Sequence, residues 1–265
     1  MNLPSAKLSS KPAAKPFAKV AANQATKQTV NQVIVNRPLT TVDVAIFSVI
    51  DESLQVLLVE RPQDADEPFP GAWALPGGIV DIAQDADLEA CARRKLFEKT
   101  GVRSPYLEQL GSWGSAARDP RGWSATHVYF ALIAAGPAAL KKGANAADVA
   151  WHPVTGEGVK PRLGFDHATL LQAAVQRLRN KVEYTSLPVY LLPDEFTLSE
   201  LQRVYEIVLA RPLEKSAFRT RVFAAGLVEE VARKREGANR PAQIYRLQRK
   251  KGLVYFPRTF NPPRE

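Results

Sequence analysis

The stretch from Gly77 to Val102 limits the possible folds of this chain more than any other. It reads G-G-I-V-D-I-A-Q-D-A-D-L-E-A-C-A-R-R-K-L-F-E-K-T-G-V, a Gly-Gly turn followed by an acidic connection and a helical segment. Asp85 or Asp87 can cap the start of this helix, and Gly101 suits the left-handed position that ends one. The stretch therefore predicts a loop and a helix in fixed order.

Short β-rich runs surround this helix. Five of them can be recognised, at 41–50, 54–59, 106–113, 126–133 and 148–151. They are rich in β-branched and aromatic residues and are bounded by turn residues, as strands are. One helix among several strands predicts a mixed α and β domain at residues 40–164.

The pattern changes after residue 164. Three segments with apolar residues at helical spacing follow, at 167–184, 197–209 and 214–225. Two β-rich runs come next, at 227–233 and 243–247, joined by a basic turn. Three helices followed by a basic hairpin are the element order of a winged helix-turn-helix. We therefore expect this domain at 165–258, with a short tail at 259–265.

The charge is unevenly distributed along the chain. The net charge is +9, and both ends are basic while the middle is mildly acidic. This asymmetry favours a polyanion partner, most simply nucleic acid, although a solvated basic surface is the alternative. Residues 1–39 are Lys-rich, Ala-rich and Pro-bearing without apolar periodicity, so we expect a disordered basic tail.

Cysteine usage and hydropathy point to a soluble intracellular protein. The single cysteine, Cys91, lies in the predicted helix and reads as a buried apolar residue. Without a second cysteine no disulfide framework exists, which favours a reducing, cytoplasmic location. No apolar run approaches the roughly 20 residues that span a bilayer, so we expect no membrane partner.

The stretch at 77–102 resembles the Nudix box, G-x5-E-x7-R-E-U-x-E-E-x-G-U, in which U is aliphatic. The second half matches at five positions: Arg94, Leu96, Glu98, Gly101 and Val102. Lys95 and Lys99 stand where the box has glutamates, and the front half is longer by two residues. The resemblance implies an α+β chain: a Nudix-type α/β/α sandwich with a mixed sheet, followed by the winged helix-turn-helix.

The two lysines change the chemistry expected of the box. Lys95, Glu98 and Lys99 share one helix face, because they lie three and four residues apart. Three carboxylates there would hold Mg²⁺ against a pyrophosphate, whereas ammonium groups repel the metal and attract the pyrophosphate directly. We therefore expect nucleotide binding with no catalytic residue, no metal ligand and no required cofactor, with Mg²⁺ needed only if hydrolysis is retained. The alternative is a metal site rebuilt from other carboxylates: Asp81, Asp85, Asp87 or Glu89.

Basic and aromatic side chains near the box are the candidates for binding the nucleotide. Arginines bind phosphates, and an exposed indole can stack on a base. The predicted ligand-binding residues are Arg61, Arg94, Lys95, Glu98, Lys99, Arg118, Arg121 and Trp123. Ordinary solvated loops are the alternative for the arginines and tryptophan outside the helix.

Polar residues on the third C-terminal helical segment are the candidates for reading DNA. A recognition helix places such side chains in the major groove, and a wing contacts phosphates or the minor groove. The predicted contacts are Lys215, Ser216, Arg219, Thr220 and Arg221 on the helix and Lys234, Arg235, Asn239 and Arg240 on the wing. Glu214 reads as the helix cap and Phe218 as core. A helical accessory domain with a solvated basic face is the alternative.

From about residue 40 to 258 the chain resembles the Nudix-related transcriptional regulators of bacterial NAD metabolism, the NrtR family. The resemblance rests on the long box front D-I-A-Q-D-A-D-L-E, the degenerate R-K-L-F-E-K-T-G-V, the loop R-D-P-R-G-W, the helix opening F-D-H and the C-terminal runs F-T-L-S-E-L-Q-R-V-Y-E, F-R-T-R and R-P-A-Q-I-Y-R-L. It implies a homodimeric repressor that binds a palindromic operator in double-stranded DNA. Its effector would be ADP-ribose or another NAD-derived nucleotide.

Two other functions remain open from the sequence. The first is an ADP-ribose or ADP-sugar pyrophosphatase whose C-terminal domain serves only dimerisation, because some relatives of similar fold keep this activity. The second is an RNA-associated Nudix protein. Lys95 and Lys99 bear directly on the first alternative, since they remove carboxylates that the reaction needs.

Overall fold

The computed structural model describes residues 37–103, 106–135, 146–236, 241–248, 252–257 and 259–260. The chain divides into two compact units, Met1–Pro38 and Leu39–Glu265, and the fold given below is that of the second. Nearly all of the predicted tail at 1–39 lies outside the described residues, as do Asn239 and Arg240. No helix in the described ranges is long and apolar enough to cross a membrane.

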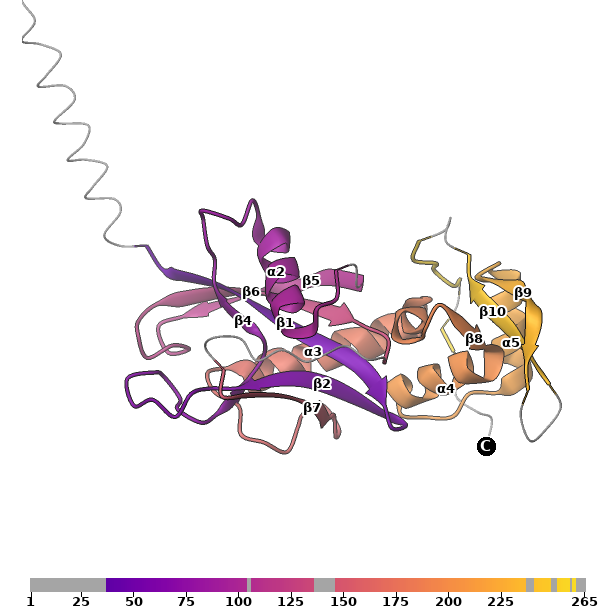
Figure 1. Ribbon diagram of the computed structural model, residues 1–265, viewed down its shortest axis with the longest axis horizontal. Helices are drawn as coiled ribbons and strands as arrows, with labels where there is room; N and C mark the ends of the chain where they lie inside the picture. Colours follow the sequence, from indigo (N-terminus) through magenta and orange to yellow (C-terminus); the bar gives the residue numbers. More distant parts are fainter. Residues whose placement is uncertain are drawn as a thin grey trace, which may run out of the picture. The chain divides into compact units, whose positions relative to one another are not determined.

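A mixed sheet of seven strands forms the core of the first half of this unit (Figure 1). Its strands are β1 (Leu39–Ile50), β2 (Ser53–Glu60), β3 (Trp73–Ala74), β4 (Gly77–Ile79), β5 (Tyr106–Ser115), β6 (Ser124–Leu132) and β7 (Asp148–Pro153). The main order is β3-β2-β1-β6-β5, with β4 paired to β1 and β7 to β2. β1 and β6 run parallel while the other pairs are antiparallel, so the sheet is mixed as expected.

Helices cover both faces of this sheet. They are α2 (Leu88–Thr100) and α3 (His167–Val182). Successive residues of a strand point to opposite faces, and β1 shows the result. Val44 packs in an apolar cluster with Cys91 of α2, whereas Phe47 packs in another with Leu170 of α3. This arrangement confirms the predicted α/β/α sandwich.

The ends of α2 are set by the residues that the sequence suggested. The Asp87 carboxylate accepts a hydrogen bond from the Ala90 amide at 2.7 Å and caps the start. Gly101 takes the left-handed conformation, with φ of 70°, and ends the helix. Of the two candidate caps Asp87 is the one used, and Asp85 binds Arg94 instead. Cys91 is fully buried, as predicted.

Helix α3 packs on the sheet, although the sequence-based division assigned it to the C-terminal domain. Its buried residues Leu170 and Leu178 belong to one apolar cluster that also holds Phe47 of the sheet and Tyr205 of the C-terminal part. An amphipathic pattern reveals an apolar stripe but not the surface that covers it, so the sequence left the partner of α3 undecided. The domain boundary at residue 164 stays a prediction, because the core is continuous across it.

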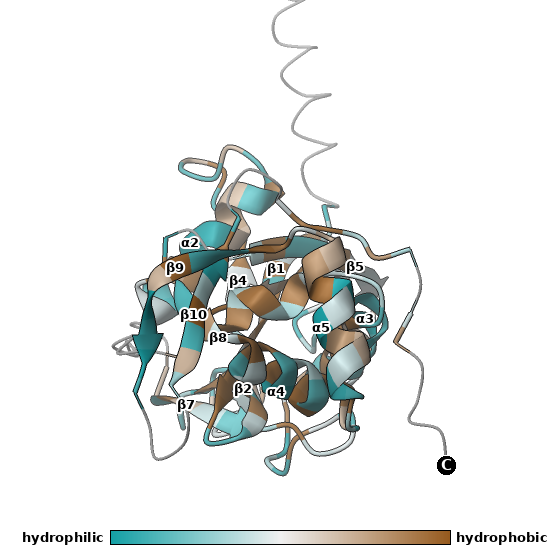
Figure 2. Cartoon of the chain, turned by 90° about the vertical axis from the view of Figure 1, so that its right-hand side faces the viewer, coloured by the Kyte–Doolittle hydropathy of each residue, from teal (hydrophilic) through white to brown (hydrophobic). Residues whose placement is uncertain are grey.

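The C-terminal part combines two α-helices and a short 3₁₀ helix with a small sheet. Its elements are the 3₁₀ helix η1 (Leu187–Leu191), β8 (Glu195–Thr197), α4 (Leu198–Leu209), α5 (Lys215–Ala224), β9 (Val228–Arg235) and β10 (Ala242–Leu247). The three strands are ordered β8-β10-β9. Figure 2 views this part directly, and hydrophilic residues follow much of β9. No strand was expected at β8, because three residues are too few to show alternation.

Local signals set the two helices of this part. The Thr197 hydroxyl accepts a hydrogen bond from the Glu200 amide, and the Glu200 carboxylate accepts one from the Thr197 amide, so the two residues form a capping box at the start of α4. The Glu214 carboxylate accepts hydrogen bonds from two amides at the start of α5. Phe218 and Val222 form the apolar face of α5 and are buried in the core. Glu214 and Phe218 therefore hold the positions predicted for them.

Candidate ligand site and DNA-binding face

Lys95 reaches from α2 to the Gly-Gly turn that opens the box. A Cβ atom added to Gly78 would lie 3.2 Å from Lys95 Nζ, so the ammonium group lies directly over this turn. Nζ is also 4.0 Å from Oε2 of Glu98, and the Lys95 side chain is 17% exposed. A fixed positive charge therefore occupies the face that a Nudix box normally fills with carboxylates.

Lys99 lies one turn further along the same helix and is largely buried. Burial lowers the pKa of Lys99; Glu98 opposes this shift, and the ammonium of Lys95 adds to it. Lys95, Glu98 and Lys99 thus interact electrostatically, as expected from their spacing. One carboxylate between two ammonium groups is a poor donor set for Mg²⁺, which prefers several oxygen ligands.

Arg94 is held by a carboxylate from the lengthened box front. Its Nε and Nη2 donate to the two oxygens of Asp85 at 2.7 and 2.6 Å, and Nη1 donates to Glu98 at 2.9 Å. The paired guanidinium holds the pKa of Asp85 well below its usual range, although burial opposes the shift. In this structure Arg94 fastens the box front to the helix, and its predicted contact with ligand stays a prediction.

The remaining acidic residues of the box segment also have partners within the protein. The Asp81 carboxylate accepts hydrogen bonds from Gln84 and from the Ala83 amide, and Glu89 forms an ion pair with Arg93. Asp87 is the helix cap described above. Across the described ranges, no three His, Cys, Asp or Glu side chains are grouped so that they could hold a metal ion. The rebuilt metal site therefore gains no support from these contacts.

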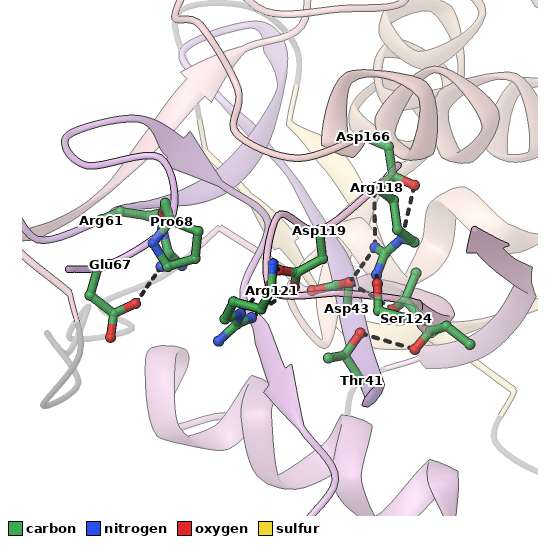
Figure 3. Close-up of polar contacts among 12 residues, drawn as sticks. Thr41, Asp43, Arg61, Glu67, Pro68, Arg118, Asp119, Arg121, Ser124 and Asp166 are labelled. Carbon is green, nitrogen blue, oxygen red and sulfur yellow. Dashed lines mark hydrogen bonds and ion pairs between the residues drawn. The ribbon is translucent and has the colours of Figure 1, made fainter. Parts of the chain in front are cut away.

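A buried polar network lies at the start of α3 (Figure 3). The Arg118 side chain, only 4% exposed, donates to both carboxylate oxygens of Asp166 at 3.0 Å and to Ser124 Oγ at 3.2 Å. Its Nη2 lies 3.8 Å from Oδ2 of Asp43. Arg118 therefore joins the loop before β6 to the residue that precedes α3. It is not a free guanidinium at the surface.

His167 connects this network to the backbone that leads into the box. The Leu75 amide donates to its Nδ1 at 2.9 Å, which leaves Nε2 carrying the proton in the neutral ring. Nε2 lies 3.7 Å from Oδ2 of Asp43, which also accepts a hydrogen bond from Thr126 at 2.7 Å. Burial lowers the pKa of His167, against the opposing effect of Asp43. The imidazole is therefore favoured in its neutral form.

Sequence reasoning did not single out Asp43 or His167 as site residues. A charged residue inside the apolar run at 41–50 was the available signal for Asp43, and the helix opening F-D-H was the signal for His167. Neither signal identifies a partner, because β1, β6 and α3 bring the residues together from distant parts of the chain.

Arg61 belongs to a different loop. Its guanidinium donates to Glu67 at 2.7 Å and to the Pro68 carbonyl at 2.5 Å, and lies 5.0 Å from the centroid of the Phe165 ring. These contacts fold the loop after β2 back on itself, as Figure 3 shows for Arg61, Glu67 and Pro68. Arg61 thus stabilises this loop before any ligand binds.

Arg121 and Trp123 are the exposed members of the predicted ligand set outside α2. Arg121 donates to both oxygens of the buried Asp119, at 3.0 and 2.8 Å, yet its side chain remains 46% exposed. The Asp119 partner raises the pKa of Arg121. Trp123 is 51% exposed. Both side chains are therefore accessible to a ligand from solvent.

Four of the five predicted contacts on α5 share its outer face. The exposed residues are Lys215, Ser216, Arg219 and Thr220. Phe218 and Val222 occupy the buried face between them. A helix with a rigid apolar face and a basic outer face has the form of a recognition helix.

The Arg221 side chain lies away from this outer face, against residues near the C-terminus. Its Nη2 donates to the Thr259 carbonyl at 2.6 Å, and its guanidinium lies 3.9 Å from the ring centroid of Phe260. Burial lowers the pKa of Arg221. Arg221 therefore does not share the outer face of the other four residues.

The described part of the wing presents Lys234 and Arg235, both exposed on β9. Arg235 forms an ion pair with Glu200, the capping residue of α4. The predicted contacts Asn239 and Arg240 lie outside the described residues. Lys234 is thus the described wing residue best placed to meet a phosphate.

Comparison with known families agrees with both halves of this description. Residues 39–174 match the NUDIX domain, and residues 188–247 match the NrtR DNA-binding winged helix domain. The fold and site thus define a Nudix domain joined to a DNA-binding winged helix. The chain belongs to the NrtR family of Nudix-related transcriptional regulators.

Two relatives, one of them solved in two forms, illustrate the similarity. The ADPR responsive transcriptional repressor NtrR of Acinetobacter baylyi is 49% identical over 227 residues, which cover 86% of this chain and 89% of the relative. Shewanella oneidensis NrtR, solved with a 27mer DNA, is 39% identical with a TM-score of 0.75, covering 84% of this chain and 99% of that one. The NUDIX domain of the Shewanella protein, solved with ADP ribose, is 38% identical with a TM-score of 0.50, covering 62% and 99%.

Proposed function

We propose that this protein is a repressor that binds operator DNA through α5 and the wing and releases it when ADP-ribose binds the Nudix domain. The observation that carries the proposal is the position of Lys95, whose Nζ lies over the Gly-Gly turn of the Nudix box. The same chain also presents a basic recognition helix. A positive charge at this point favours binding a pyrophosphate and disfavours the metal that would help to hydrolyse it. The names of the relatives support the same ligand and partner.

In this proposal the predicted ligand residues have two kinds of role. Lys95 lies over the Gly-Gly turn, and Arg121 and Trp123 are about half exposed, so these three contact the phosphates and the base directly. The others are Arg61, Arg94, Glu98, Lys99 and Arg118. They are buried or engaged with protein partners and shape the site around the ligand. A nucleoside diphosphate with an attached sugar supplies both the charges and the ring that such a set recognises.

The proposed operator is a palindrome read by a homodimer. A two-fold dimer presents two α5 helices, and specific binding needs half-sites about 34 Å apart, one turn of the duplex. The proposed contacts are Lys215, Ser216, Arg219 and Thr220, with Lys234 on the wing. A small rotation of one protomer against the other changes the separation of the two helices and weakens binding.

Helix α3 is the proposed route from ligand to DNA. Its start is fixed to the Nudix sheet by the Arg118–Asp166 pair, and near its end Lys181 forms an ion pair with Glu108 of β5. The chain then enters the C-terminal part through Thr185, whose carbonyl accepts a hydrogen bond from Tyr205 of α4. A shift of α3 is therefore passed to the winged helix through direct contacts.

A titration tests this function. A duplex selected by the protein from a random 27-base-pair library is labelled, and its affinity is measured by fluorescence anisotropy with and without ADP-ribose. Coupling between sites typically changes affinity by about 5- to 150-fold, and we expect a weakening in this range. Selection of a duplex followed by an unchanged affinity in saturating ADP-ribose would show that this ligand is not the effector.

A further inference from the structure

The C-terminal strap, defined as residues 254–257 and 259–260, packs on the winged helix. Phe256 and Phe260 are 6% and 7% exposed. The Phe260 ring lies 5.2 Å from that of Tyr205 in α4 and 6.0 Å from that of Phe218 in α5, centroid to centroid. The strap therefore completes the core beneath the recognition helix, although it lies beyond residues 188–247 that match the winged helix domain.

The start of the strap is paired with the segment that follows α3. The Phe256 amide donates to the Tyr184 carbonyl at 2.7 Å, and the Ser186 amide donates to the Val254 carbonyl at 2.9 Å. The Val254 amide donates back to Ser186 Oγ at 2.9 Å. These bonds form a short antiparallel ladder, so one end of the strap is fixed to the exit of α3.

Arg221 joins the other end of the strap to α5. Its guanidinium lies 3.9 Å from the Phe260 centroid and 5.6 Å from that of Phe256, and it donates to the Thr259 carbonyl. A planar guanidinium can stack on a ring and donate in its own plane at once, which an ammonium cannot do. An arginine at position 221 can therefore make the ring contact with Phe260 and the hydrogen bond to Thr259 together, and a lysine cannot.

A second arginine strengthens the same connection. Arg211, in the turn between α4 and α5, donates to the Phe260 carbonyl at 3.0 Å and to both oxygens of Glu183 at 2.8 Å. Glu183 follows directly after α3. The strap, Arg211 and Arg221 thus tie the exit of α3 to the helix whose opposite face carries Lys215 and Arg219.

We propose that Arg221 is a positioning residue for DNA recognition, which sets the orientation of α5 through the C-terminal strap without touching DNA. This replaces the contact with DNA that the sequence suggested for it. A small tilt of α5 in the groove worsens the geometry of the contacts on its outer face, while the same cations still neutralise the same phosphates. The inference rests on the proposed function to the extent that the protein binds duplex DNA.

The test compares Arg221→Gln with Arg219→Gln, its neighbour on the outer face, in the full-length protein. Affinity for the selected duplex is measured over a series of salt concentrations. Loss of a cation that lies on DNA reduces the slope of log affinity against log salt by about 1, as we expect for Arg219→Gln. Arg221→Gln should weaken binding about tenfold at every salt concentration with the slope of the wild type.

Two further variants separate positioning from contact and from loss of fold. Arg221→Lys keeps the charge but should not restore affinity, and Phe260→Leu should weaken DNA binding without adding to the Arg221→Gln defect. ADP-ribose binding, measured by calorimetry, should be unchanged in Arg221→Lys and in Phe260→Leu, which would show that the Nudix domain is intact. A reduced salt slope for Arg221→Gln, wild-type affinity for that variant, or full rescue by lysine would each overturn the inference. If the wild type selects no duplex, the proposed function has failed instead.

Discussion

The guanidinium of Arg94 and the carboxylate of Asp85 form a two-point ion pair, with N–O distances of 2.7 and 2.6 Å. Asp85 lies in the acidic connection, which is two residues longer than in the Nudix box, and its side chain is 1% exposed. Its Oδ2 also accepts a hydrogen bond from the Asp81 amide at 2.9 Å. The pair therefore closes the longer connection against α2 and uses the box arginine to do so.

Replacing Asp85 with asparagine should lower the free energy of unfolding by about 1–3 kcal/mol at pH 7, because Arg94 loses a charged partner. The pKa of Asp85 is depressed in the folded state, mainly by Arg94. Its contribution is therefore complete above the unfolded pKa of about 3.9 and is lost as the pH falls below it. Urea denaturation of both proteins from pH 7 to 3 measures this, and a constant difference at all pH values would contradict the assignment.

Replacing Lys95 with glutamine should weaken ADP-ribose binding about tenfold, since a charged contact to the pyrophosphate is lost. The wild type should bind equally well in EDTA and in Mg²⁺, whereas Lys95→Glu should bind only when Mg²⁺ is present. Isothermal titration calorimetry measures all three proteins. Arg93→Gln is the matched control, because Arg93 is on the same helix but pairs with Glu89.

The enzymatic alternative is examined with the same proteins. Ordinary enzymes turn over at about 1–10³ s⁻¹, and the wild type should hydrolyse ADP-ribose in Mg²⁺ far more slowly than this. Turnover in the ordinary range would identify the chain as a pyrophosphatase and would show that Lys95 does not exclude the metal. DNA release by ADP-ribose would then need a separate explanation.

Neutralising Lys234 should weaken DNA binding to about the same extent on all sequences and lower the salt slope by about 1, as expected of a phosphate contact. Arg235→Gln is the matched comparison, because this neighbouring residue pairs with Glu200 and should change the slope less. Electrophoretic or anisotropy titrations at several salt concentrations give both slopes. Equal slopes for the two variants would mean that the Glu200 pair opens on DNA.

Replacing Gly77 with alanine should destabilise the protein by about 3 kcal/mol or more, in the range of severe steric substitutions. The added Cβ would lie 2.0 Å from Asp43 Oδ1 and 2.6 Å from the Val42 carbonyl, so β4 and β1 would have to separate. Gly158→Ala is the control, because nothing lies within 4 Å of its Cβ position. Thermal unfolding of the two variants should differ clearly, and similar midpoints would show that β1 and β4 adjust without cost.

Local chemistry made much of the fold readable from the sequence. The caps of α2 and α4 depend on residues next to the helix. The five longer strands of the main sheet are runs rich in β-branched, aromatic or other apolar residues, so their positions were predicted to within a few residues. β3, β4 and β8 were missed because two or three residues carry no periodicity. The replacement of two glutamates of the Nudix box by Lys95 and Lys99 could also be read directly from the sequence.

The partners of charged side chains could not be predicted from the sequence in the same way. Arg118 was predicted to contact the nucleotide and Arg221 to contact DNA, yet each side chain is turned inward, to groups 48 and 38 residues away along the chain. An ion pair or a ring contact depends on which surfaces meet after folding, and residue type alone does not encode this.

The sequence by itself determined the family, the order of the elements and the reversal of charge in the Nudix box, since each depends on residues close together in the chain. The tertiary structure alone decided where that charge acts. It placed Lys95 over the Gly-Gly turn, committed Arg94 to Asp85 and joined Arg221 to the C-terminal strap. The physical reason is that burial and pairing, which determine whether a charge is free to bind a ligand, arise only when distant segments pack together.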